Sequence, residues 1–136
     1  EAARHVKLGP GGLSDVEWTI QLIQMRDAQR VPALCTPSTT GAILAAREGG
    51  LLEASDAHTL LDAWDMATRI RAANTLATGR MSGVKLDVLP RDSAELCAVA
   101  AILGYGSGGL TALEEDWLRA GRKARAVMER LFWEQQ

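Results

Sequence analysis

A glycine-rich turn precedes two acidic residues near the start of the chain: Gly9, Gly11 and Gly12 are followed by Asp15 and Glu17. Such a turn can bind phosphate where it runs into a helix, because free N–H groups and the helix dipole both favour an anion. The segment lacks the Lys-Ser/Thr pair of a P-loop, and the two carboxylates would repel a phosphate in the first turn. The sequence therefore predicts a cation or an arginine beside them. The alternative is a tight turn followed by a capping box, with no ligand.

The two carboxylates do not have the spacing of a metal site. On a helix, side chains two positions apart point about 200° apart, so Asp15 and Glu17 cannot hold one ion together. The chain has no Asp-x-Asp pair, and no serine or cysteine lies at useful spacing from His5 or His58. We therefore expect neither metal binding nor hydrolytic catalysis from these 136 residues alone.

A polar stripe of Glu17, Gln21 and Gln24 runs along the helix that should follow the turn. At about 100° per residue, the stripe separates two apolar sets: Val16, Ile20 and Ile23 on one side, and Trp18, Leu22 and Met25 on the other. A helix with two apolar faces is expected to pack between neighbours. The stripe then needs either solvent in a cleft or polar partners.

Gly and Pro residues divide the chain into five predicted helices. Their expected ranges are 14–28, 39–48, 55–78, 92–103 and 111–133. Alanine (22) and leucine (18) far outnumber valine (7) and isoleucine (5), and this balance favours helices over a sheet. We predict an all-α fold, an antiparallel bundle of about five helices with a Gly-rich N-terminal turn. Residues 1–136 should form a single domain, with residues 1–13 as its lead-in.

Local signals predict where the helices begin and end. Ser14 and Glu17 have the spacing of a capping box, and Asp92 opens a second such box. The third helix should begin with a cap at position 55 or 56 and end at Gly79. In the last helix the apolar residues step by three and four, which indicates one buried stripe: Leu110, Leu113, Trp117, Ala120, Ala124, Val127 and Leu131.

Four polar residues lie in the second half of the third predicted helix: Arg69, Arg71, Asn74 and Thr75. Polar groups at mid-helix reduce the stability of a buried face unless something binds them. Two arrangements stay open. The arginines can lie at the surface beside an Ala/Ile core face, or they can point inward and meet Glu17 or a nucleotide phosphate.

Charge and composition argue against several partner classes. The 15 Lys and Arg residues against 17 Asp and Glu give a net charge of −2, so no overall field attracts nucleic acid or an anionic membrane. The longest apolar run, residues 96–103, is too short to span a bilayer, and residues 1–5 lack the apolar stretch of a signal peptide. Cys35 and Cys97 are too few for a disulfide framework. We expect a reduced, cytoplasmic protein with no nucleic-acid or membrane partner.

The run from Lys7 to Gln21 reads Lys-Leu-Gly-Pro-Gly-Gly-Leu-Ser-Asp-Val-Glu-Trp-Thr-Ile-Gln. It resembles a signature of bacterial glutamine synthetase adenylyltransferases, Lys-x-Gly-x-Gly-Gly-Ile-x-Asp-Ile-Glu-Phe-x-x-Gln. Leu13, Val16 and Trp18 stand where that family more often has Ile, Ile and Phe. In that family the segment follows each nucleotidyltransferase subdomain and opens a helical domain. The resemblance continues through residues 37–39, 50–52, 69–76 and 103–105, and so covers nearly the whole chain.

The resemblance implies a bifunctional parent enzyme of nitrogen metabolism. Such an enzyme uses ATP and Mg²⁺ to transfer AMP to a tyrosine of glutamine synthetase, and it removes the AMP by phosphorolysis. This chain looks like its C-terminal helical domain, with a nucleotidyltransferase core ahead of it in the same polypeptide. That core needs an Asp-x-Asp pair to hold Mg²⁺. The pair is absent here, so we expect these residues alone to be inactive and to bind neither cofactor.

The partners implied by the resemblance are glutamine synthetase and the preceding core, with a PII-type signalling protein as a further candidate. No catalytic residue or metal ligand is expected in this chain. The candidates for cleft or substrate contact are Gly11, Gly12, Asp15, Glu17, Gln21, Gln24, Arg69 and Arg71.

Two functions stay open for the helical domain. In the first, it packs on the core and helps to form the cleft, in adenylylation, deadenylylation or both. In the second, it is a scaffold or regulatory docking domain with no direct role in the chemistry. An open polar groove beside residues 9–12 would favour the first function, and a stripe sealed by partners within the domain would favour the second.

Overall fold

A computed structural model describes residues 2–79, 83–106 and 108–133. Its α-helices are α1 (Leu13–Asp27), α2 (Thr39–Glu48), α3 (Ala54–Thr78), α4 (Ser93–Ile102) and α5 (Leu110–Trp133). Short 3₁₀ turns lie at Ala2–Arg4, Pro32–Leu34 and Val84–Asp87. The described ranges contain an isolated bridge between His5 and Val88 but no strand, which confirms the all-α class. None of the described helices is long and apolar enough to cross a membrane.

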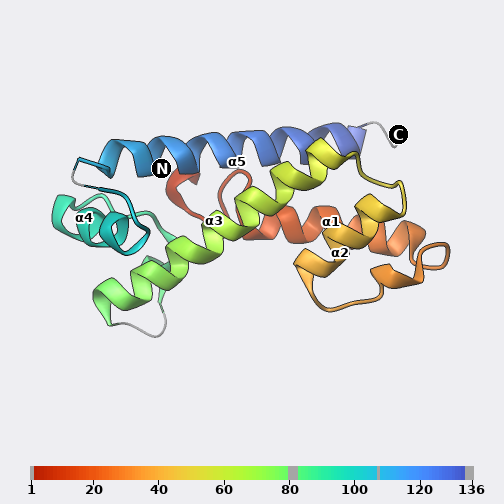
Figure 1. Ribbon diagram of the computed structural model, residues 1–136, viewed down its shortest axis with the longest axis horizontal. Helices are drawn as coiled ribbons and strands as arrows, with labels where there is room; N and C mark the ends of the chain where they lie inside the picture. Colours follow the sequence, from red (N-terminus) through yellow and green to blue (C-terminus); the bar gives the residue numbers. More distant parts are fainter. Residues whose placement is uncertain (1, 80–82, 107, 134–136) are drawn as a thin grey trace.

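The longest helices, α3 and α5, extend along the molecule, and α3 packs against each of the other four (Figure 1). Helices α1 and α2 lie toward one end of the molecule, and α4 lies toward the other. The contacts between the start of α1 and α5 move toward the C-terminus in both segments: Gly11 lies against Gly121, and Asp15 pairs with Arg125. The two helices therefore run in the same direction. In a five-helix bundle of alternating direction the first and last helices also run the same way, so the antiparallel arrangement stays a prediction.

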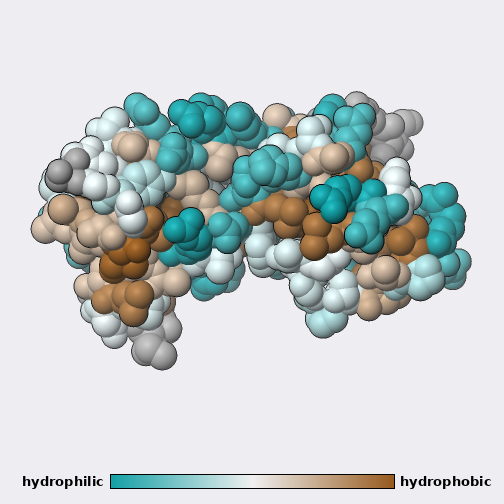
Figure 2. All heavy atoms as spheres, viewed as in Figure 1, coloured by the Kyte–Doolittle hydropathy of each residue, from teal (hydrophilic) through white to brown (hydrophobic). Residues whose placement is uncertain are grey.

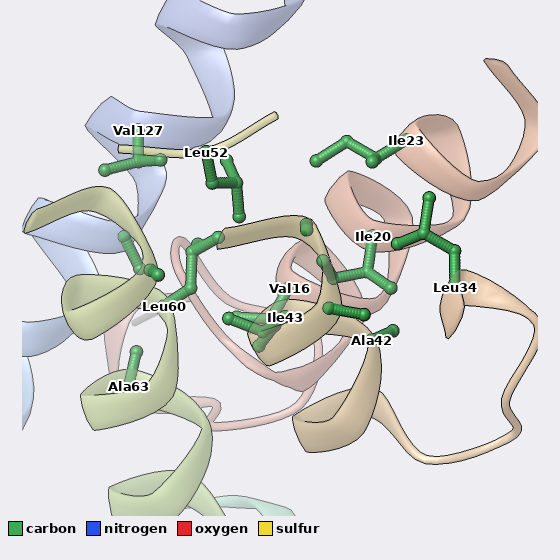
Figure 3. Close-up of a cluster of buried hydrophobic side chains, with 14 residues drawn as sticks. Val16, Ile20, Ile23, Leu34, Ala42, Ile43, Leu52, Leu60, Ala63 and Val127 are labelled. Atoms are coloured by element: carbon green, nitrogen blue, oxygen red, sulfur yellow. The ribbon is translucent and has the colours of Figure 1, made fainter. Parts of the chain in front are cut away.

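Buried apolar side chains form two clusters. The first joins α1, α2 and the first half of α3 to the C-terminal half of α5, with Val16, Leu60 and Val127 among its members (Figure 3). The second joins the N-terminal turn, the second half of α3, α4 and the first half of α5, and it contains the fully buried Trp117. The predicted stripe of α5 therefore contributes to both clusters. Four of its members are buried: Leu113, Trp117, Ala124 and Val127.

Several helix ends lie where local signals placed them. Helix α2 has the predicted bounds, Thr39–Glu48, and the Ser38 hydroxyl caps its first turn. Asp92 caps α4, because its carboxylate accepts a hydrogen bond from the Glu95 N–H at 3.0 Å. Gly79 ends α3 in the left-handed conformation, with φ of 70°.

The predicted capping box of α1 is wrong. The helix begins at Leu13, with Gly12 in the N-cap position and no side-chain cap. The backbone N–H groups of Leu13 and Ser14 instead donate to the carbonyls of Val6 and Lys7, at 2.9 Å each. In a capping box the Glu17 carboxylate would accept from the Ser14 N–H, but the Lys7 carbonyl already does so, and the Val16 N–H donates to the Gly12 carbonyl at 3.2 Å. Gly12, and not Ser14, is therefore the N-cap. Helices α3 and α5 also begin one residue earlier than predicted, and α3 has no side-chain cap.

Residues 2–12, predicted as a lead-in, pack within the helical domain. The indole N–H of Trp117 donates to the carbonyl of Ala3 at 2.9 Å. The Arg4 guanidinium donates to the carbonyl of Leu89 at 3.1 Å and pairs with Glu114 at 3.1 Å. These contacts hold the start of the chain against α5 and the segment that precedes α4.

Candidate functional site

Close packing explains the glycines of the N-terminal turn. Gly11 has φ of +71°, and a Cβ added to it would lie 1.9 Å from the carbonyl oxygen of Gly121 in α5. A Cβ on Gly12 would lie 2.6 Å from the Val6 oxygen, and one on Gly121 would lie 2.8 Å from the Pro10 oxygen. The turn therefore rests directly on the backbone of α5, and only glycine permits this approach.

The N–H groups of the turn are used within the domain. The Gly11 N–H donates to the Asp15 carboxylate at 2.7 Å, and the Gly12 N–H donates to the Gly9 carbonyl at 2.9 Å. The first two N–H groups of α1 bond to turn carbonyls. Because these donors are occupied, the turn does not offer the phosphate site that a glycine loop can form.

Asp15 meets an arginine, the kind of neighbour that the sequence predicted. One carboxylate oxygen lies 3.0 Å from Nη1 of Arg125 in α5, and the Asp15 side chain is only 17% exposed. Arg125 also pairs with Glu129, at 2.9 Å. The hydrogen bonds to Glu129 and then to Asp15 are the largest influences that raise the pKa of Arg125 above its ordinary value. Asp15 thus ties α1 to α5 and has a structural role.

The polar stripe of α1 borders a groove of about 220 Å³, which it shares with residues 36–39. Gln24 is held there, because its amide donates to the carbonyls of Leu34 at 2.8 Å and Thr36 at 3.2 Å. Glu17 and Gln21 line the same groove, and across the described part of the chain their side chains make no hydrogen bond or ion pair. The stripe is therefore sealed at Gln24 and open at Glu17 and Gln21.

The second apolar set of α1 lies at the surface. Trp18 is 62% exposed and Met25 is 85% exposed, whereas Leu22 is half-buried. Figure 2 shows exposed hydrophobic atoms at the end of the molecule that α1 and α2 build. The prediction that α1 packs between neighbours on two sides is therefore wrong for the described residues of this chain.

Two polar side chains of α3, the half-exposed Arg71 and the buried Asn74, contact the segment that follows the helix. Arg71 forms an ion pair with Asp87, with Nε 2.5 Å from Oδ1. The buried Asn74 amide donates to the carbonyls of Leu86 at 2.9 Å and Val88 at 3.1 Å. Arg71 therefore belongs to the internal packing of the domain, and not to a site shared with α1.

Arg69 lies away from Glu17, in a separate cleft of about 420 Å³ between α3 and α5. Its guanidinium is 4.0 Å from Asp65. In the same cleft the Tyr105 hydroxyl donates to Asp116 at 2.6 Å. Burial, followed by this hydrogen bond, raises the pKa of Tyr105 to about 12. Of the two arrangements left open for the α3 arginines, the structure therefore excludes the one in which they meet Glu17.

Three of the residues that matter here were missed from the sequence: Arg125, Gly121 and Tyr105. A glycine in the middle of a helix can signal a close backbone approach, so Gly121 did carry a signal. Arg125 did not, because 110 positions separate it from Asp15. Nothing near Tyr105 in the sequence indicates its contact with Asp116.

A family model and several curated proteins match nearly the whole chain. The family model described as GlnD PII-uridylyltransferase matches residues 1–133. A protein of Streptomyces coelicolor is 46% identical over 129 residues, which are 95% of this chain and 12% of that protein. A protein of Leifsonia xyli subsp. xyli is 47% identical over 133 residues, 98% of this chain and 13% of that protein.

Both relatives are named bifunctional glutamine synthetase adenylyltransferase/adenylyl-removing enzyme, and so is a Cutibacterium acnes protein that is 45% identical over 132 residues. The chain spans about one eighth of the length of these relatives. The resemblance that residues 7–21 indicated is confirmed: the chain belongs to the GlnD PII-uridylyltransferase family and is similar, over nearly its whole length, to a segment of bifunctional glutamine synthetase adenylyltransferases.

Proposed function

We propose that this chain is the C-terminal helical domain of an enzyme that transfers AMP from ATP to a tyrosine of glutamine synthetase and removes it by phosphorolysis. In this proposal the domain packs on a nucleotidyltransferase core that precedes it in the same polypeptide. Its polar groove forms part of the wall of the catalytic cleft. The names of the relatives support the activity, and the groove along α1 supports the role of the domain.

The observation that carries the proposal is the contrast between two carboxylates two positions apart. Asp15 is bound by Arg125 and by the Gly11 N–H. Glu17 lines the open groove and, within the described ranges, has no hydrogen bond or ion pair. A carboxylate in this position can accept hydrogen bonds from an arginine of the core, from a hydroxyl or amino group of a nucleotide, or from glutamine synthetase. We therefore expect Glu17 to be the residue of this domain that binds a group in the catalytic cleft.

We propose that this chain does not itself hold the Mg²⁺ of the reaction. Holding a metal at a triphosphate requires several carboxylates together, and in the described ranges no three His, Cys, Asp or Glu side chains are grouped to hold a metal. Asp15 is already bound by Arg125. We propose that the core supplies both the metal ligands and the reacting groups, while the helical domain contributes only to the wall.

One observation favours the alternative of a scaffold or regulatory docking domain. The Gln24 amide nitrogen donates twice to the segment that follows α1, so this part of the stripe stabilises the fold. If Glu17 and Gln21 are likewise unimportant outside the domain, the groove is a surface feature. A partner such as a PII-type signalling protein would then bind elsewhere.

The substitution Glu17→Gln tests the proposal in the longer protein, which is this chain with the nucleotidyltransferase core ahead of it. Loss of a charge-assisted contact worth about 1.5–3 kcal/mol should lower the rate of adenylylation about ten- to hundredfold. The melting temperature should stay nearly constant. Glu115→Gln is a matched control, because Glu115 is exposed on α5. Full activity of Glu17→Gln would support the scaffold.

A further inference from the structure

Exposed apolar side chains of α1 and of the C-terminal part of α5 form one surface. On α1 it consists of Trp18, Leu22 and Met25. On α5, a hollow of about 340 Å³ is lined by Met128, Phe132 and Trp133 together with Arg125 and Glu129. Trp133 is 68% exposed and Phe132 is 37% exposed. We call the six apolar residues the α1–α5 outer surface.

The two rows of this surface start from the same ion pair. Asp15 is followed by Trp18 and Leu22 at three and seven positions, and Arg125 is followed by Met128 and Phe132 at the same spacings. Residues at these spacings share one face of a helix. Because Asp15 pairs with Arg125 and α1 and α5 run in the same direction (Figure 1), the two rows extend side by side from the pair.

We propose that the nucleotidyltransferase core of the longer protein covers the α1–α5 outer surface. This inference rests on the proposed function and names the surface through which the domain would meet its core. Contiguous exposed apolar surface on a soluble protein indicates an interface, and aromatic and methionine side chains are enriched in interfaces. Trp18, Met25 and Trp133 are the most exposed members of this surface.

The place where the chain enters the domain favours the core as the occupant. Trp117 and Arg4 hold the start of the chain against α5. From Trp117, Arg125 lies about 12 Å and Phe132 about 22 Å along the helix, at 1.5 Å per residue. A core attached ahead of residue 1 would therefore start close enough to reach this surface. The matched segment makes up 12–13% of the relatives, which leaves most of their length for other domains. A core in the same polypeptide is tethered to this domain and would reach the surface at high effective concentration.

Methionine oxidation by hydrogen peroxide tests this inference without measuring activity. The oxidation rate of Met25 is measured by peptide mass spectrometry in the 136-residue chain and in the longer protein. Because oxidation follows exposure, we expect Met25 to react about tenfold more slowly in the longer protein. Met66, which lines the α3–α5 cleft, is the internal control and should react equally in both. Equal rates for Met25 would overturn the inference.

A variant shows whether the surface itself causes the protection. Trp18→Lys leaves the domain core intact, because Trp18 is largely exposed, and it should restore rapid oxidation of Met25 in the longer protein. Leu76→Lys is the matched control, since Leu76 is 73% exposed on α3, and it should leave Met25 protected. Protection that survives Trp18→Lys would place the core elsewhere and overturn the inference.

A second copy of the chain is the competing occupant, and sedimentation distinguishes it. We expect the 136-residue chain to sediment as a monomer. A dimer that Trp18→Lys dissociates would overturn the inference in favour of self-association. The docking surface and the proposed function can fail separately. Unprotected Met25 together with an inactive Glu17→Gln enzyme would overturn only the docking surface. Protected Met25 with a fully active Glu17→Gln enzyme would support the docking surface and overturn the role of the groove.

Discussion

Within residues 7–21, the glycine turn with Asp15 has its partners inside the domain, whereas Glu17 and Trp18, which follow in the same helix, have none among the described residues. In the N-terminal turn and the first turn of α1, the Gly11 N–H and the Asp15 carboxylate find partners inside the domain, and Gly11 lies against the backbone of Gly121 in α5. Elsewhere on α1, Glu17 lines an open groove and Trp18 is largely exposed. We call these two residues the outer face of α1. The turn holds the domain together, whereas the outer face is left for something outside it.

This contrast explains why residues of one motif need not share one role. Asp15 and Glu17 have the same charge and lie in the same helix, yet among the described residues only Asp15 pairs with an arginine of α5. The side chains of the two residues point about 200° apart. Substitutions in the turn should therefore change stability, and substitutions on the outer face should change function.

Trp117→Ala should have the largest effect, because it removes the anchor beneath the turn. The side chain is fully buried and its indole N–H bonds to Ala3. Truncation of a buried tryptophan costs about 3–5 kcal/mol. Urea denaturation of the 136-residue chain measures the loss. A loss below about 0.5 kcal/mol would mean that the α5 stripe is not part of the core.

Gly121→Ala should come next, because the new Cβ would lie 2.8 Å from the Pro10 carbonyl oxygen. Displacing the turn from α5 should cost about 1–3 kcal/mol in the free energy of unfolding. Gly41→Ala in α2 is the matched helical control, since its Cβ would approach only side-chain atoms, the nearest at 3.2 Å, and its effect should be far milder. Similar losses in the two variants would remove the special role of the turn contact.

Asp15→Asn should cost about 1 kcal/mol, because it removes the charge that faces Arg125 but keeps an acceptor for the Gly11 N–H. The Arg125 side chain is 43% exposed, so solvent screens the pair and the loss stays modest. Thermal unfolding at low and high salt measures it, and the difference from the wild type should shrink at high salt. A difference independent of salt would contradict the ion-pair explanation.

Glu17→Gln should have the smallest effect on the isolated chain, within about 0.5 kcal/mol. No contact inside the described part of the domain depends on its charge. Chemical denaturation beside Asp15→Asn measures the comparison directly. A destabilisation by Glu17→Gln equal to that of Asp15→Asn would show that Glu17 also serves the fold.

Local patterns predicted those features that depend on neighbouring residues. The bounds of α2, the Asp92 cap and the Gly79 stop each follow from residues within one turn. The capping box of α1 failed because the Val6 and Lys7 carbonyls already accept the hydrogen bonds from its first N–H groups. Gly12 takes the N-cap position, and its carbonyl accepts from the Val16 N–H.

The candidate site residues lie in different parts of the structure, because their contacts are with residues far along the chain. The first turn of α1 predicted an arginine beside its carboxylates, but not that Arg125, 110 positions away, would supply it. Arg69 and Arg71 were grouped with Glu17 by residue type, whereas Arg71 pairs with Asp87 and Arg69 lines a different cleft. Residue type predicted the kind of partner, and tertiary packing determined which residue it was.

The most direct test compares Asp15→Asn and Glu17→Gln in the longer protein, at a temperature well below both melting transitions. The adenylylation rate per folded molecule is measured for each variant. We predict that Asp15→Asn keeps nearly the wild-type rate, while Glu17→Gln loses about ten- to hundredfold. Equal losses in both variants, or a loss in Asp15→Asn alone, would contradict the division between a structural turn and a functional outer face.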